Sequence, residues 1–143
     1  MKIKGLVLDI DGTLTNDALI LDASGVESKS FCFLDIMGIS NAKKSGVKVG
    51  VISGEDSGII DIYCKKLDIN DRWKGCKDKE EALRQFAERH GLELRDIVYI
   101  GNDINDIGAM KIAGIAACPK DAHIEARKVA EFVSGKNCGN GAV

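Results

Sequence analysis

Two aspartates near the N-terminus have the types and the spacing of a catalytic pair. Asp9 and Asp11 stand at the end of an apolar run over residues 3–10. Because alternate side chains of an extended strand point to the same side, we expect both carboxylates to face one way. Two carboxylates placed in this way can divide the work of a group transfer, one as nucleophile and one as general acid and base. Gly12 allows the backbone to turn away tightly behind them.

Oxygen-bearing residues also follow two later apolar runs. Ser53 comes directly after residues 47–52. The run 97–100 is followed by three more such residues, Asn102, Asp103 and Asp106. Carboxylates gathered at this density repel one another unless a hard cation lies between them, and oxygen ligands favour Mg²⁺. Ser53 and Lys79, which opens a helical pattern, are then available to hold an anion.

The elements that must position these residues alternate along the chain. Short apolar runs without alternation are typical of parallel strands that are covered on both faces, and they occur at residues 3–10, 47–52, 97–100, 115–118 and 131–133. Helical patterns lie between them, at residues 36–45, 56–67, 79–90, 105–112 and 121–130. This alternation predicts right-handed β-α-β units, and therefore one doubly wound α/β domain with a parallel sheet over residues 1–143. Ligands bind such a sheet beyond the carboxyl ends of its strands, where the polar residues above converge.

Two segments depart from this alternation. Residues 15–33 are expected to form a β-hairpin around a turn at residues 22–25, placed as a flap over the active end of the sheet. Residues 134–143 are Gly-rich and are expected to form an extended or flexible tail.

The composition excludes several classes of protein. The chain has 143 residues, is 45% hydrophobic, and carries 20 Lys+Arg against 22 Asp+Glu for a net charge of −2. These values exclude a disordered or membrane-spanning chain, and with no basic run we expect no nucleic-acid or membrane partner. The first apolar run is interrupted by Asp9, so we expect no targeting segment and a cytoplasmic protein. Five cysteines without a C-x-x-C spacing indicate reduced thiols rather than a zinc site or a disulfide framework.

Four motifs in this order resemble those of the haloacid dehalogenase (HAD) phosphatase superfamily. They are Asp9-Ile10-Asp11-Gly12-Thr13-Leu14-Thr15, Ser53-Gly54, Lys79, and Gly101-Asn102-Asp103-Ile104-Asn105-Asp106. The resemblance covers essentially the whole chain and implies a Rossmann-like domain. The short hairpin, with no cap-domain insertion, is similar to the capless branch that acts on 3-deoxy-manno-octulosonate 8-phosphate and on nonulosonate 9-phosphates. Similar modules occur fused behind CMP-sialate synthetases.

The resemblance implies a role for each matching residue. Asp9 would attack phosphorus and form an aspartyl-phosphate, and Asp11 would protonate the leaving sugar oxygen and then activate water. Ser53, the backbone N–H of Gly54 and Lys79 would bind the phosphoryl oxygens.

The resemblance also implies a Mg²⁺ ion and an assembly. The ion would be held by the Asp9 carboxylate, the Asp11 carbonyl and the residue after Gly101. That residue is Asn102, where the family usually has Asp, so we expect weaker Mg²⁺ binding, with Asp103 or Asp106 compensating from nearby. The capless branch further favours a homotetramer, in which a neighbouring chain closes the site.

Other interpretations remain open at this stage. Ser53 can instead be the N-cap of a helix starting at Asp56, and Lys79 a solvated residue in a charged run. Glu55 stands where octulosonate phosphatases often have Arg, and it either contacts the sugar or is an ordinary first-turn acid. Asp106 can hold a loop instead of contacting the metal. Asn102 also favours a second hypothesis, a weakly active or non-catalytic HAD module that serves oligomerisation.

Overall fold

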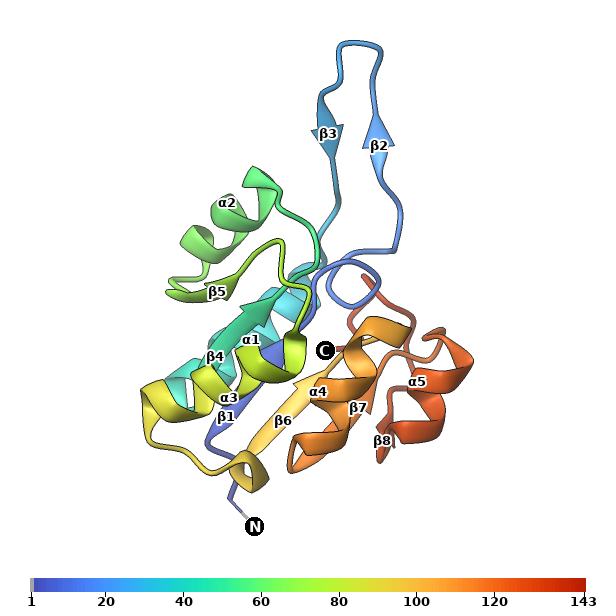
Figure 1. Cartoon of the computed structure of the whole chain (residues 1–143). Coiled ribbons are helices and arrows are strands. Elements are labelled where there is room, and N and C mark those ends of the chain that lie inside the picture. The colour runs from blue at the N-terminus through green and yellow to red at the C-terminus, as the bar shows by residue number, and fades with distance from the viewer. Residues whose placement is uncertain (1) are drawn as a thin grey trace.

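A parallel sheet runs through the middle of the molecule, with the N-terminal strand near its centre (Figure 1). The structure is a computed structural model that describes residues 2–143. Within these residues the sheet has six strands in the order β5-β4-β1-β6-β7-β8. The strands are β1 (Gly5–Leu8), β4 (Lys48–Ile52), β5 (Asp71–Trp73), β6 (Ile97–Ile100), β7 (Ile115–Cys118) and β8 (Phe132–Val133). The predicted doubly wound α/β fold is confirmed.

Helices cover both faces of this sheet. The helices are α1 (Phe33–Lys44), α2 (Gly58–Lys66), α3 (Lys79–His90), α4 (Ile107–Ile112) and α5 (Ile124–Val129), with 3₁₀ turns η1 (Leu94–Asp96) and η2 (Ile104–Asp106). Adjacent residues of β1 separate the two halves of the core: Val7 packs with α3, α4 and α5, while Leu8 packs with α1 and α2. Burial on both faces is the reason that the strands read as continuous apolar runs.

Helices α1, α2, α4 and α5 differ from their predicted bounds by up to three residues, and one strand was not predicted. Strand β5 was not expected, because its residues Asp71, Arg72 and Trp73 form no apolar run. It lies at the edge of the sheet, where pairing with β4 is enough to define it. Helix α2 begins later than expected, with the Ser57 side chain accepting from the backbone N–H of Ile59. The interpretation of Ser53 as the N-cap of this helix is therefore wrong.

Helix α3 has the predicted bounds because its end signals are local. The Asp78 side chain accepts from the backbone N–H of Glu81 at the N-terminus. Gly91 ends the helix in the left-handed conformation, with φ of 61°. These two caps place Lys79 in the first turn of the helix, at the carboxyl edge of the sheet.

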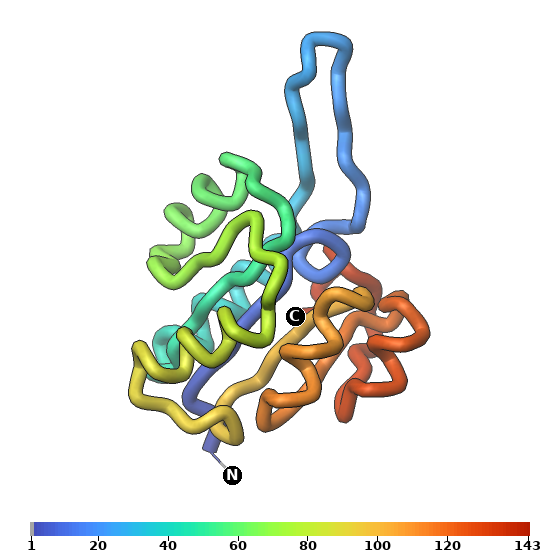
Figure 2. The backbone as a smooth tube through the Cα atoms, in the orientation of Figure 1, coloured from blue at the N-terminus to red at the C-terminus, as the bar shows by residue number. Residues whose placement is uncertain are grey.

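The hairpin projects away from the body of the molecule (Figures 1 and 2). Strands β2 (Ile20–Leu21) and β3 (Glu27–Ser28) pair in an antiparallel manner. The turn between them is stabilised by Asp22, whose carboxylate accepts hydrogen bonds from the backbone N–H groups of Ser24 and Val26. After β1 the chain runs out along one strand of the hairpin and back along the other. It returns to the carboxyl ends of the sheet strands, where α1 begins.

Residues near the C-terminus contact the loop after β1, helix α1 and the loop before α5. The backbone N–H of Gly139 donates to the Thr13 carbonyl, and that of Val143 donates to Asp35 Oδ1 at 2.9 Å. A third contact joins the backbone N–H of Cys138 to the Asp121 carboxylate. These contacts hold the tail in one position in the structure, while its flexibility stays a prediction.

Two further features concern the length of the helices and the state of the cysteines. Over residues 2–143 no helix combines the length and the apolar character needed to cross a bilayer. The five cysteines are all free thiols, and Cys64, Cys118 and Cys138 are buried.

Candidate active site

A polar crevice lies at the carboxyl edge of the sheet, where the loops after three adjacent strands meet. Because β1 lies between β4 and β6, the residues that follow these strands become neighbours. The chain leaves β1 toward β4 and leaves β6 toward β7, in opposite directions, and such a switch point opens a crevice. The hollow measures about 150 Å³ and is lined by Asp9, Asp11, Asp17, Ser53, Gly54, Glu55, Asn102, Asp103 and Asn105.

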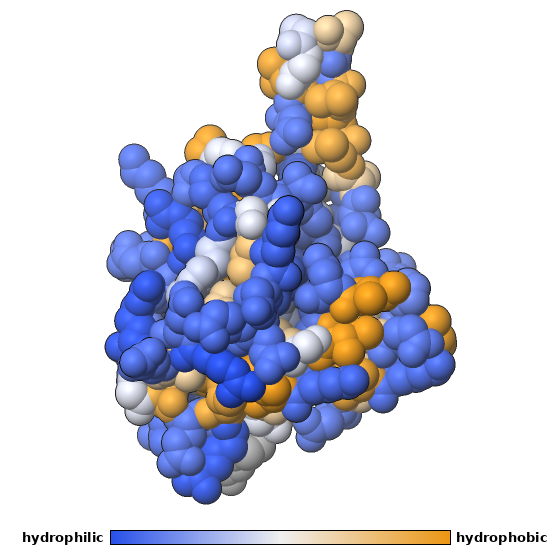
Figure 3. All heavy atoms as spheres, in the orientation of Figure 1, coloured by the Kyte–Doolittle hydropathy of each residue, from blue (hydrophilic) through white to orange (hydrophobic). Residues whose placement is uncertain are grey.

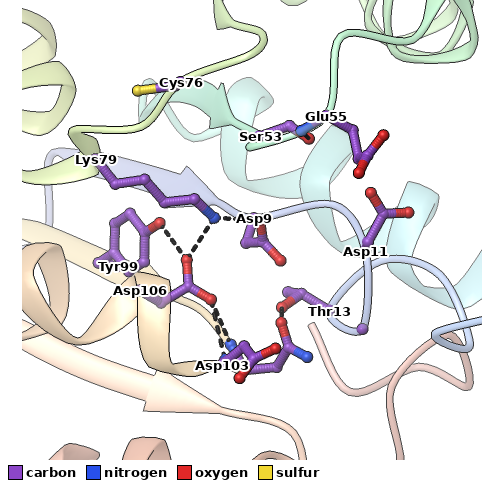
Figure 4. A network of polar contacts seen from close by, with 12 residues as sticks. Asp9, Asp11, Thr13, Ser53, Glu55, Cys76, Lys79, Tyr99, Asp103 and Asp106 are labelled. Carbon is purple, nitrogen blue, oxygen red and sulfur yellow. Dashed lines mark hydrogen bonds and ion pairs between the residues drawn. The ribbon is translucent and has the colours of Figure 1, made fainter.

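Lys79 extends from the start of α3 to Asp9, which lines the crevice, and joins two carboxylates (Figure 4). Its Nζ lies 2.6 Å from Asp9 Oδ1 and 2.7 Å from Asp106 Oδ1. The Lys79 side chain is only 2% exposed. Burial by itself lowers the pKa of this ammonium, but the charges of Asp9 and Asp106 outweigh that effect and raise it. Lys79 is therefore a buried cation directed at Asp9 and not a solvated helix residue.

Asp106 anchors this cation and the loop after β6. Its Oδ1 accepts from Lys79 and from the Tyr99 hydroxyl at 2.7 Å. Its Oδ2 accepts from the backbone N–H groups of Asn102 at 2.9 Å and Asp103 at 3.1 Å. With four donors on one fully buried carboxylate, Asp106 positions Lys79 and has no oxygen left over for a metal ion.

Asp103 is likewise engaged in its own loop. Its Oδ1 accepts from the backbone N–H of Ile104 at 2.7 Å and forms the N-cap of η2. The structure thus brings Asp103 to the rim of the crevice and uses its carboxylate locally.

Asp9 lies in surroundings that disfavour its charge. Burial is the main cause and the negative charge of Asp106 the second; together they raise the pKa of Asp9 to about 7, although Lys79 opposes them. One ammonium shared between two carboxylates leaves a deficit of positive charge here. An additional cation at Asp9 would relieve it.

The Asn102 side chain closes the crevice on the side of β6. One terminal atom of its amide lies 3.0 Å from Asp9 Oδ2 and 2.9 Å from the Asp11 carbonyl oxygen. If that atom is the amide nitrogen, it donates to both oxygens; if it is the amide oxygen, three acceptors face one another with no donor between them. In the first orientation the amide is hydrogen-bonded to both oxygens, and in the second its oxygen is available to bind a cation.

The geometry of these three atoms fits a small hard cation. Metal–oxygen distances near 2.1 Å in an octahedral shell place neighbouring ligands about 3.0 Å apart, and the two separations in this crevice are 2.9 and 3.0 Å. The described residues 2–143 contain no cluster of three or more His, Cys, Asp or Glu side chains that could hold a metal ion. The candidate ligands of this crevice are of another kind, because two of the three are a backbone carbonyl and an amide.

Gly12 makes the close approach of Asn102 possible. Its φ is +80°, and a Cβ at this position would lie 2.0 Å from Asn102 Nδ2. A side chain here would strain the backbone and displace the amide from Asp9.

Ser53 lines the crevice at the end of β4. It is 1% exposed, and its Oγ accepts from the backbone N–H of Glu55 at 3.1 Å. Its backbone N–H donates to Trp73 in β5, so the edge strand fixes the loop. The side chains of Glu55 and Asp11 point toward one another across the hollow (Figure 4).

Three residues of this site were not predicted from the sequence. Asp17 lines the crevice with φ of 65°, and burial together with the charges of Asp103 and Asp11 raises its pKa. Lys29 pairs with Asp11 at 2.6 Å, and Tyr99 holds Asp106. For Tyr99 the available signal was its place on β6, the strand that leads into the loop of Asn102, whereas Lys29 approaches Asp11 only through the return of the hairpin.

Comparisons with known proteins give a consistent result. The family of haloacid dehalogenase-like hydrolases matches residues 73–143. The chain is 32% identical over 141 residues to 3-deoxy-D-manno-octulosonate 8-phosphate phosphatase KdsC of Haemophilus influenzae, covering 99% of this chain and 78% of the relative.

Two solved structures agree with this similarity. One is the phosphatase of the same description from Moraxella catarrhalis, in complex with a magnesium ion, a phosphate ion and KDO; it is 33% identical, with a TM-score of 0.95 over 99% of this chain and 81% of that one. The other is the cobalt-bound form from Haemophilus influenzae, 32% identical, with a TM-score of 0.95 over 99% and 82%.

Proposed function

Because this chain belongs to the haloacid dehalogenase-like hydrolases and is a phosphoric monoester hydrolase, we propose that it acts on a 2-keto-3-deoxy sugar acid phosphate. The substrate is octulosonate 8-phosphate or nonulosonate 9-phosphate, the ion is Mg²⁺, and the reaction passes through an aspartyl-phosphate. The relatives named above, one of them holding magnesium, phosphate and KDO, support this choice.

Asp9 is the nucleophile of the proposed reaction. Its Oδ1 is held by Lys79 at 2.6 Å, and Oδ2 lies beside Asn102. The carboxylate attacks phosphorus, the bond from phosphorus to the sugar oxygen breaks, and an aspartyl-phosphate remains. Burial of Asp9 keeps bulk water from competing with this step.

Asp11 handles the proton in both steps. It stands on the side of the crevice that opens toward the hairpin, where the leaving group must lie. As general acid it gives a proton to the leaving sugar oxygen, and as general base it then takes one from the water that attacks the aspartyl-phosphate. The second attack breaks the bond between phosphorus and Asp9 and restores the free carboxylate.

Ser53, the backbone N–H of Gly54 and Lys79 bind the phosphoryl oxygens. Ser53 is fixed by the loop after β4, and Lys79 by Asp106. Since phosphoryl transfer asks mainly for positioning and charge stabilisation, donors held rigidly before the substrate arrives are effective.

The Asp9 carboxylate, the Asp11 carbonyl and the Asn102 amide would hold Mg²⁺. When bound, the ion neutralises the charge that otherwise separates an anionic carboxylate from an anionic phosphate. The observation that carries this proposal is the meeting of these three groups at 2.9 and 3.0 Å beside the Lys79–Asp9 pair.

The leaving group is proposed to contact Glu55 and the hairpin. A second hollow of about 150 Å³ adjoins the crevice and is lined by Asp11, Asp17, Glu55 and the hairpin residues Ala18, Leu19, Glu27 and Lys29. Glu55 is the side chain placed to accept hydrogen bonds from sugar hydroxyls there.

A substrate screen tests the proposal. Release of phosphate is measured from octulosonate 8-phosphate, a nonulosonate 9-phosphate, neutral hexose phosphates and p-nitrophenyl phosphate, each with Mg²⁺ and with a chelator. We expect Mg²⁺-dependent release with one sugar acid phosphate preferred. Equal rates on all esters would contradict the substrate class, and no release from any would favour a non-catalytic module.

A further inference from the structure

Lys29 connects the returning strand of the hairpin to the carboxylate of Asp11. Its Nζ lies 2.6 Å from Asp11 Oδ1. The two residues are 18 positions apart in the chain. The contact therefore exists because the hairpin returns to the carboxyl edge of β1.

The pair is unequally buried. The Lys29 side chain is 4% exposed, whereas that of Asp11 is 31% exposed. A buried ammonium is costly unless it is paired, so Lys29 is held to this partner more firmly than a surface lysine would be. Asp11 has one oxygen engaged by a fixed cation and keeps access to the crevice.

The two hollows place this pair at the junction between phosphate and leaving group. Asp11 lines both the crevice beside Asp9 and the hollow under the hairpin, and Lys29 lines the second of these. The bond between phosphorus and the sugar oxygen breaks at this junction, and the leaving oxygen receives its proton there.

We propose that Lys29 is a positioning residue that decides which oxygen of Asp11 carries the transferred proton. This inference rests on the proposed function. By donating to Oδ1, Lys29 makes that atom a hydrogen-bond acceptor. Oδ2 is then the oxygen that gives a proton to the leaving sugar oxygen and later takes one from water. Lys29 contacts Asp11 through its carboxylate and not through the carbonyl oxygen that is proposed to hold Mg²⁺.

This role predicts a defect that depends on the leaving group. A sugar alkoxide must be protonated as it departs, whereas p-nitrophenolate is stable enough to leave without an acid. The ratio kcat/KM reports the steps up to release of the leaving group and so isolates the acid role of Asp11.

The experiment compares Lys29→Met with Lys29→Arg and with Lys111→Met, an exposed lysine of α4 that serves as the matched control. Each full-length variant is assayed with octulosonate 8-phosphate or the preferred sugar acid phosphate, and with p-nitrophenyl phosphate. For Lys29→Met we expect kcat/KM to fall about tenfold or more on the sugar phosphate and to stay within about twofold on the aryl phosphate. Lys29→Arg should recover most of the lost kcat/KM, and Lys111→Met should have the kcat/KM of the wild type on both esters.

The alternatives give different results. An equal fall on both esters means that Lys29 merely supports the hairpin, and no fall on either means that Asp11 is positioned without it; both overturn the inference while leaving phosphatase activity intact. A wild-type protein that hydrolyses neither ester overturns the proposed function and this inference together. The melting temperature of each variant shows whether a loss of activity comes from a displaced hairpin.

Discussion

At the scale of single residues, the site has more carboxylates than cationic side chains to pair with them. Asp9, Asp11, Asp17, Glu55 and Asp103 line one hollow of about 150 Å³. Two lysines reach this region, Lys79 from inside and Lys29 from the hairpin, and each is already paired. An anionic substrate is therefore expected to bind only together with a metal cation.

The first prediction concerns Asp9. Replacing Asp9 with Asn keeps the volume but removes the nucleophilic carboxylate, so kcat should fall by roughly three orders of magnitude or more. Phosphate release under saturating substrate and Mg²⁺ measures this, and circular dichroism confirms that the variant is folded. Retention of a substantial fraction of the rate would show that another residue attacks phosphorus.

The second prediction concerns Asn102. If its amide oxygen is a ligand, Asn102→Asp adds a charge and should tighten Mg²⁺ binding by about tenfold or more, while Asn102→Ala should weaken it. Calorimetric titration with Mg²⁺ gives both affinities. Two unchanged affinities would exclude Asn102 as a ligand and direct attention to Asp103.

At the scale of elements, α3 and the loop after β6 meet through one buried carboxylate. Asp106 joins Lys79 of α3, Tyr99 of β6 and two backbone N–H groups of the intervening loop. Burial, with the negative charge of Asp106 as the second cause, raises the pKa of Tyr99 well above its usual range, so its hydroxyl remains a donor. This network fixes the position of α3, which carries Lys79, relative to the loop after β6, which carries Asn102.

The third prediction tests that network with Tyr99→Phe, which removes only a hydroxyl. Loss of a hydrogen bond to a charged group should lower the free energy of unfolding by about 1.5–3 kcal/mol and should lower kcat more than it changes KM, because Lys79 loses part of its support. Denaturant titration and steady-state kinetics measure the two effects. Unchanged values of both would show that Asp106 is held by its other donors.

The fourth prediction concerns the contact between α1 and the tail. Asp35 is 1% exposed; its Oδ1 accepts from the backbone N–H of Val143, and its Oδ2 lacks a partner among the described residues. Burial raises its pKa above 3.8, although the backbone N–H groups of Val143 and Gly141 oppose this. Between 3.8 and the raised value the folded protein binds more protons than the unfolded chain, so stability falls as the pH rises through this window.

Asp35→Asn should remove that dependence. The melting temperature of the variant relative to the wild type should increase as the pH is raised from about 4 to about 7. Parallel thermal scans at several pH values provide the comparison, with Glu88→Gln on the exposed face of α3 as a control. A constant difference across the range would show that Asp35 does not titrate within it.

At the scale of the whole molecule, the hairpin exposes more apolar surface than an isolated flap needs. Leu19, Ile20, Leu21 and Val26 are each more than half exposed, and Figure 3 shows apolar atoms along the hairpin. At its base Phe33 is 78% exposed. Apolar patches of this kind are typical of interfaces between subunits.

The fifth prediction is a homo-oligomer, most consistent with a tetramer, in which the hairpin or tail of one chain closes the site of its neighbour. Sedimentation at micromolar concentration should give a mass that is a multiple of the 15.4 kDa chain, and deletion of residues 135–143 should raise KM. A fully active monomer, or an unaltered KM after the deletion, would contradict the prediction.

The sequence by itself determined the elements whose signals are local. The bounds of α3 follow from Asp78 and Gly91, and β6 and β7 match their apolar runs because both faces of these strands are buried. It also determined that Asp9, Ser53 and Asn102 would meet, since the ends of parallel strands share one edge. Polar strand β5 escaped prediction because its place depends on pairing with β4 and not on its own residues.

Only the tertiary structure decided what each polar group does once it is there. Asp106 was expected to compensate for Asn102 at the metal, but the fold surrounds it with four donors and makes it the support of Lys79. Lys29 reaches Asp11 through the path of the hairpin, a contact between residues 18 positions apart. Residue type and spacing specify which groups reach the edge of the sheet; the partners of each group depend on burial and on long-range packing, which are properties of the whole chain.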